Sequence, residues 1–98
     1  MTTPTANRLV LFVCTGNTCR SPMAEALLRR ALSADSGWRA ASAGLAAVPG
    51  LPASGDAVRV LGETGVDLAG HRSRPLTPAL VRDATLVVAL ARSHFAQI

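Results

Sequence analysis

Residues 11–28, LFVCTGNTCRSPMAEALL, place an apolar segment, a short polar loop and a helix-like segment in immediate succession. The apolar segment extends from Arg8 to Val13 without polar alternation, as expected for a parallel strand that is covered on both faces. Ser21 has the side chain of a helix N-cap, and Pro22 suits the first helical position, where its missing N–H costs nothing. A strand, a tight loop and a helix are therefore predicted, and the loop region holds both cysteines of the chain.

Apolar side chains recur at helical spacing after Pro22, which predicts a buried stripe along one face of the helix. The stripe consists of Met23, Leu27, Leu28, Ala31 and Leu32. Glu25 and Arg29 are four residues apart and can form an ion pair on the exposed side.

The rest of the chain continues to alternate strand-like and helix-like segments. The predicted elements are a strand at 38–44, a helix at about 54–63, a helix from 78 that is capped by Thr77, a buried strand at 85–90 and a helix from 92 onward. This alternation is typical of a right-handed α/β layer around a parallel sheet. Ligands of such sheets bind beyond the carboxyl ends of the strands, which is where the loop after Val13 is expected.

The composition limits the class of protein. A chain of 98 residues allows one domain, and a hydrophobic content of 49% excludes a disordered chain. No apolar run approaches the ~20 residues of a membrane helix, and the N-terminus lacks a basic region and an apolar signal core. We therefore expect a cytoplasmic protein without a membrane partner. The net charge of +4 comes from dispersed arginines with few aromatic residues, which argues against nucleic-acid binding.

The two cysteines could serve a disulfide, a metal site or a reactive thiol. A small secreted domain usually carries more than one disulfide, and a structural zinc site needs four ligands. The segment CTGNTC supplies only two ligands, with His71 and His94 far along the chain. Redox or nucleophilic chemistry is the better interpretation, and neither a metal nor another cofactor is expected.

The loop from Cys14 to Arg20 has the composition of an oxyanion site. Gly16 lets the backbone approach a ligand closely, and Asn17 tolerates a left-handed turn. Successive amide groups can then converge on an anion, with the helix N-terminus adding partial positive charge. Arg20 offers a planar fork that matches two phosphate oxygens. The same positive surroundings favour a thiolate at Cys14, and Ser21 can donate a further hydrogen bond to the sulfur.

An isolated Cys-Gly-Asn would suit a plain turn, whereas Cys, five residues, Arg and Ser-Pro at a helix start is a demanding pattern. The segment 13–28, VCTGNTCRSPMAEALL, resembles the signature loop of the low-molecular-weight protein tyrosine phosphatases. Similarity continues at 42–44, 51–77 and 83–98, so that it covers nearly the whole chain. It implies an α/β fold with a parallel sheet in a three-layer sandwich, of the phosphotyrosine protein phosphatase I-like type.

The resemblance has gaps at its C-terminal end. The family's last strand, its C-terminal helix and its general-acid Asp in an Asp-Pro motif have no counterpart among the 98 residues. We therefore expect residues 1–98 to form a single domain with the N-terminal two-thirds of the family's usual length, as a fragment or a truncated relative. Without the last strand, the edge of the strand at 85–90 would be exposed, which predicts a possible dimer through that edge.

The resemblance also implies catalytic roles in the loop. Cys14 would attack phosphorus and form a cysteinyl-phosphate, Arg20 would stabilise the equatorial oxygens, and Ser21 would assist the departure of the thiolate. A phosphorylated protein would be the substrate, and inorganic phosphate or a similar oxyanion would bind in the loop. The phosphate-binding residues would be Thr15, Gly16, Asn17, Thr18 and Cys19.

Two further positions support the loop in this interpretation. Asn17 would hold the strained loop, tethered by Ser42 and His71, although a histidine in an irregular segment is also compatible with a plain surface position. Cys19 resembles the family's second cysteine, which can form a reversible disulfide with the nucleophile. Alternatively, Cys19 fills a small buried volume.

The substrate and the activity leave alternatives open. Phosphotyrosine-directed members usually carry a bulky aliphatic residue at the position of Thr18, whereas bacterial relatives that act on phosphoarginine tend to carry threonine. The segment 45–52 also lacks an aromatic wall. We therefore expect hydrolysis of phosphotyrosine or phosphoarginine on proteins, impaired because the acid is missing. An arsenate reductase of the same fold and a non-catalytic module that binds phosphate or phosphoproteins are the alternatives.

Overall fold

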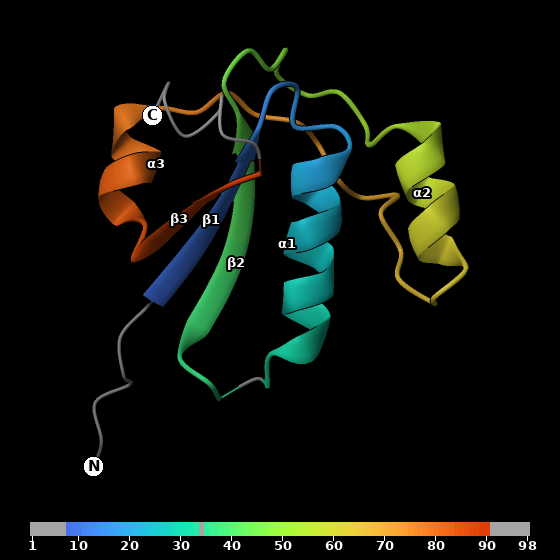
Figure 1. The fold of residues 1–98 in the computed structure, drawn as a ribbon, viewed down its shortest axis with the longest axis horizontal. Helices are drawn as coiled ribbons and strands as arrows, with labels where there is room; N and C mark the ends of the chain where they lie inside the picture. Colours follow the sequence, from blue (N-terminus) through green and yellow to red (C-terminus); the bar gives the residue numbers. More distant parts are fainter. Residues whose placement is uncertain (1–7, 34, 91–98) are drawn as a thin grey trace.

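The computed structural model describes residues 8–33 and 35–90, which form one parallel sheet with helices on both sides (Figure 1). The sheet has the strand order β2-β1-β3. The elements are β1 (Arg8–Cys14), α1 (Arg20–Ala31), β2 (Trp38–Gly44), α2 (Gly55–Gly62), α3 (Pro78–Asp83) and β3 (Leu86–Ala89). Both neighbours pair in parallel with the central strand β1, so the predicted α/β class with a parallel sheet is confirmed.

Two apolar clusters hold the layers together. Alternate residues of β1, among them the fully buried Leu11 and Val13, pack with Leu80 of α3, so α3 covers that face of the sheet. A second cluster around Ala57 and Leu61 joins α2 to α1, which lies on the other side of the sheet from α3 (Figure 1). The result is a helix–sheet–helix arrangement with α2 packed on the flank of α1.

The predicted caps of the two later helices are confirmed. The hydroxyl of Ser54 accepts a hydrogen bond from the amide of Ala57 at the start of α2. The hydroxyl of Thr77 accepts from the amide of Leu80, with Pro78 in the first turn of α3. Each side chain satisfies an amide that the helix itself leaves unpaired.

The predicted start of the first helix is wrong by two positions. The helix α1 begins at Arg20, and its N-cap is Cys19, which makes no side-chain capping bond. Ser21 and Pro22 lie inside the first turn and are buried. The hydroxyl of Ser21 does not cap the helix because it is engaged with Cys14 and Asn17 instead.

Two burial predictions are also corrected. Leu27, expected in the buried stripe of α1, is 47% exposed, whereas Met23 and Ala26 pack against the cluster of α2. The covered face of α1 is therefore rotated toward α2. The strand β3, expected to be buried, is only partly buried, and Leu86 is 53% exposed.

Two predictions about the C-terminal part of the chain are not tested by the described residues. The helix expected from residue 92 lies outside the described residues, and the dimer through the edge of β3 stays a prediction. None of the helices in the described ranges combines the length and the apolar character needed to span a bilayer.

Candidate active site

The loop that carries both cysteines connects the carboxyl end of β1 to the start of α1 (Figure 1). Cys14, the last residue of β1, is 4% exposed, whereas Cys19 and Arg20 are exposed. Both cysteines are free thiols, so the reversible disulfide implied by the resemblance stays a prediction. The loop thus has a buried thiol beneath it and an exposed guanidinium group at its end.

The sulfur of Cys14 lies in a polar contact at the helix N-terminus. Its Sγ is 2.9 Å from the Oγ of Ser21, which is fully buried. The first turn of α1 carries no acidic side chain. The amides of that turn direct their partial positive charge toward the loop, and no carboxylate in the turn offsets it for an incoming oxyanion.

Asn17 fixes the shape of the loop. It is fully buried and has a left-handed backbone, with φ of 57°. Its Nδ2 donates to the Oγ of Ser42 at 2.9 Å, and its Oδ1 accepts from the amide of Arg74 at 2.8 Å. Its backbone oxygen lies 2.7 Å from Nε2 of His71, which must be the donor because a carbonyl can only accept. The structure thus brings Ser42 and His71 to the residue that the resemblance assigned them to support.

The end of β2 supports the loop from the side. The amides of Leu45 and Ala46 donate to the carbonyl oxygens of Cys14 and Thr15, both at 2.9 Å. A Cβ at Gly44 would come within 2.6 Å of Thr15 O and 2.9 Å of the amide nitrogen of Asn17. Only glycine lets the strand approach the loop backbone this closely.

The remaining loop residues differ in exposure. Thr15 is exposed, and Gly16 and Thr18 are half-buried. The carbonyl of Thr18 accepts from the amide of Ser54 at 2.7 Å, which ties the loop to the start of α2. The loop is therefore anchored at three places: the end of β2, the segment around His71 and the N-cap of α2.

Sequence reasoning missed three residues that contact this assembly. Gly44 was taken only as the end of a strand, and Arg74 was given no role because its backbone amide carries no sequence signal. Glu25 was predicted to pair with Arg29 on the exposed side, and the pair is present. However, the side chain of Glu25 is only 15% exposed and accepts a hydrogen bond from Ser42.

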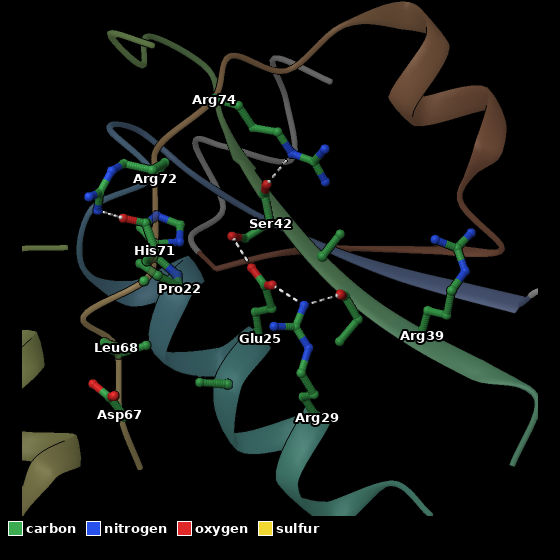
Figure 2. A pocket seen from close by; sticks show the side chains of 14 residues that line it. Pro22, Glu25, Arg29, Arg39, Ser42, Asp67, Leu68, His71, Arg72 and Arg74 are labelled. Atoms are coloured by element: carbon green, nitrogen blue, oxygen red, sulfur yellow. Dashed lines mark hydrogen bonds and ion pairs between the residues drawn. The ribbon is translucent and has the colours of Figure 1, made fainter. Parts of the chain in front are cut away.

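An open cavity of about 600 Å³ lies beside the loop support, between α1, β2 and the segment around His71 (Figure 2). Its walls include Glu25, Ser42 and His71, but none of residues 14–20. The cavity is therefore distinct from the space above the sulfur. Within the described ranges, no three His, Cys, Asp or Glu side chains are grouped to hold a metal ion.

Fold and loop together define an α/β protein with a buried thiol at the end of the central strand, beside the N-terminus of a helix. Residues 9–98 match the family described as low molecular weight phosphotyrosine protein phosphatase, and the chain belongs to this family. The resemblance of the signature loop is thereby confirmed.

Individual relatives share most of this chain. A probable low molecular weight protein-tyrosine-phosphatase, EpsP of Ralstonia solanacearum, is 43% identical over 93% of this chain and 61% of its own length. The YwlE arginine phosphatase of Geobacillus stearothermophilus is 45% identical, with a TM-score of 0.87 over 93% of this chain and 57% of its own. The tyrosine phosphatase Wzb of Escherichia coli K30 in complex with phosphate is 41% identical, with a TM-score of 0.81 over 92% and 57%. The chain thus spans about three-fifths of the length of these relatives.

Replacing Gly44 by alanine is expected to displace the loop, because the new Cβ would meet the backbone of Thr15 and Asn17 rather than a flexible side chain. We expect the Kd of inorganic phosphate, measured by calorimetry, to rise at least about tenfold, or about 1.4 kcal/mol. Gly55→Ala is the matched control, because a Cβ there meets nothing within 4 Å. Equal phosphate affinity in Gly44→Ala and the control would show that the close approach does not shape the site.

Proposed function

We propose that this chain acts as a protein phosphatase that hydrolyses phosphotyrosine or phosphoarginine through a cysteinyl-phosphate. The main support is the buried sulfur of Cys14, which lies 2.9 Å from the hydroxyl of Ser21. The loop above it has a left-handed backbone at Asn17 and leads into the start of α1. The names of the relatives, which include tyrosine and arginine phosphatases, support this substrate class.

The proposed reaction has two steps at phosphorus. The thiolate of Cys14 attacks, the bond from phosphorus to the tyrosine oxygen or the arginine nitrogen breaks, and the leaving group takes up a proton. Water then attacks the cysteinyl-phosphate, loses a proton and releases phosphate, while the sulfur departs as a thiolate that Ser21 stabilises. The loop amides and Arg20 would hold the equatorial oxygens as negative charge develops on them.

A trapping experiment tests the nucleophile. Rapid acid quench of a single turnover with a phosphorylated substrate is expected to yield a phosphocysteine at Cys14, located by mass spectrometry. Cys14→Ala should lose both the adduct and the turnover, whereas Cys19→Ala should still form the adduct at Cys14. Binding without any adduct in the unchanged chain would favour the phosphoprotein-binding module. Reduction of arsenate, coupled to thiol oxidation, would favour the arsenate reductase.

The rim of the loop favours phosphoarginine over phosphotyrosine. Thr18 is half-buried there and offers a hydroxyl that can hydrogen-bond a guanidinium group or the attacking water. The segment that runs beside Cys14 and Thr15 begins with Leu45 and Ala46 and contains no aromatic residue as far as Pro52. Neither feature provides stacking for a tyrosine ring.

The variant Thr18→Ile tests this preference. An isoleucine removes the hydroxyl and adds an apolar surface that packs on a phenyl ring. We expect the ratio of kcat/KM for phosphoarginine to that for phosphotyrosine peptides to fall at least about tenfold. Thr18→Ser, which keeps the hydroxyl, serves as the control. A higher kcat/KM for phosphotyrosine in the unchanged chain would overturn the arginine preference while leaving the phosphatase proposal intact.

The aspartates of the described chain are engaged away from the sulfur. Asp56 pairs with Arg59 on the surface of α2, Asp67 accepts from the amide of Ala69, and Asp83 ends α3. Asp35 precedes the amino end of β2, at the opposite end of the sheet from the loop. None of these contacts involves the sulfur of Cys14.

The polypeptide of residues 1–98 is therefore expected to depend strongly on its leaving group. A missing general acid typically lowers the rate by about 10²–10⁴, with the largest loss for leaving groups of high pKa. Across a series of aryl phosphates, log kcat/KM should fall steeply as the pKa of the leaving phenol rises. A flat series would show that an acid within this polypeptide protonates the leaving group.

A further inference from the structure

We infer that Glu25 is a positioning residue whose carboxylate, together with the backbone amide of Arg74, sets the direction of a hydrogen-bond relay and thereby keeps Ser21 a donor to the sulfur of Cys14. The inference deepens the proposed function, on which it rests for its catalytic meaning, because the relay ends at the sulfur that would attack phosphorus.

The relay is a continuous series of short contacts between side chains. Glu25 Oε1 lies 2.5 Å from Ser42 Oγ, which lies 2.9 Å from Asn17 Nδ2. The same Nδ2 lies 2.8 Å from Ser21 Oγ, and Ser21 Oγ lies 2.9 Å from Cys14 Sγ. The three middle residues are at most 2% exposed. Water has little access to them, so their side-chain polar atoms are paired within the protein.

The direction of each hydrogen bond follows from the carboxylate of Glu25 at one end of the relay, which can only accept. An ionised carboxylate cannot donate, so Ser42 gives its single hydroxyl hydrogen to Glu25. Ser42 can then only accept from Asn17, which places the NH₂ group of the amide toward both serines. Ser21 accepts from that group and keeps its own hydrogen for the sulfur of Cys14.

Without the carboxylate, one of the two contacts that orient the Asn17 amide would be lost. Ser42 could rotate its hydrogen toward Asn17, and the amide orientation would depend on the single bond from the amide of Arg74 to Oδ1. In the flipped amide, Oδ1 would face Ser21, which would then donate to Oδ1 rather than to Cys14. The thiolate would lose a charge-assisted hydrogen bond, which is stronger than a neutral one.

Arg29 holds the carboxylate in place. It forms the ion pair with Glu25 and also donates from Nη2 to the carbonyl of Ala40 on β2 at 2.9 Å. Ala40 is two residues before Ser42 on the same strand. Arg29 therefore holds the carboxylate of Glu25 beside Ser42, whose hydroxyl donates a hydrogen bond to it. Figure 2 shows this group on the wall of the 600 Å³ cavity. The cationic side chains around the cavity are Arg29, Arg39, Arg72 and Arg74.

The variant Glu25→Gln tests the relay with little change in shape. Because Arg29 faces one of the two carboxylate oxygens, the amide NH₂ of a glutamine is directed to Ser42 and reverses the relay. We expect the rate constant for alkylation of Cys14 by iodoacetamide at neutral pH to fall about tenfold or more. Glu25→Ala, which removes the acceptor, should also slow this alkylation.

The chain provides an internal reference and a matched control. The two cysteines fall in one tryptic peptide, residues 9–20, and fragmentation separates alkylation at Cys14 from alkylation at the exposed Cys19, which should not change. Asp56→Asn breaks the other helix-surface ion pair, to Arg59 on α2, and should leave both rates unchanged. Thermal unfolding of all variants shows whether a loss of reactivity accompanies a loss of fold.

Measurements of kcat and KM distinguish a positioning role of Glu25 from a purely structural one. They also test the relay separately from the proposed phosphatase activity. We expect kcat to fall in parallel with the alkylation rate while KM stays within about twofold, because Arg20 and the loop amides still bind phosphate. A rise in KM with an unchanged alkylation rate at Cys14 would overturn the relay. If the unchanged chain shows no turnover but Glu25→Gln still slows alkylation, the relay stands and the phosphatase proposal fails.

Discussion

The site depends on the hydrogen bonds that the buried side-chain amide of Asn17 makes. A left-handed backbone at a non-glycine residue costs roughly 1–2 kcal/mol, so it persists only when the surroundings determine it. Here the side chain uses both donor hydrogens and its acceptor, and the backbone oxygen receives His71 as well. These bonds come from α1, β2 and the segment before α3, so the loop has its shape only when the whole parallel layer has formed.

Much of the fold could be predicted because its signals are local. Each signal specifies the backbone of the residues next to it: the apolar run in β1, Thr77 and Pro78 at the start of α3, and the glycine at the end of β2. The burial of α1 could not be predicted in the same way. Its helical stripe identified a set of apolar side chains, but the packing of α2 decided that Met23 and not Leu27 is covered.

The site shows the same division between local and distant information. The spacing of Cys14, Arg20 and Ser21 is a continuous motif, and it predicted an oxyanion loop from the sequence alone. Arg74 contributes through a backbone amide that any residue would have, and its Nε also donates to the carbonyl of Ser42 at 3.0 Å. Glu25 looked like half of a surface ion pair, and only the folded chain shows that the carboxylate turns toward Ser42. Contacts made across 17 or 57 positions in sequence leave no pattern in the neighbouring residues.

The helix start shows how stability and reactivity compete for the same hydroxyl. A serine at the N-cap contributes about 1 kcal/mol to a helix, yet α1 begins after Cys19, which makes no side-chain capping bond. Ser21 lies two residues further, where its hydroxyl contacts the sulfur of Cys14 and the amide of Asn17 instead. An oxyanion bound in the loop would satisfy the uncapped amides of the first turn. The same feature that weakens the helix start would therefore favour binding of a phosphoryl group over the sulfur of Cys14.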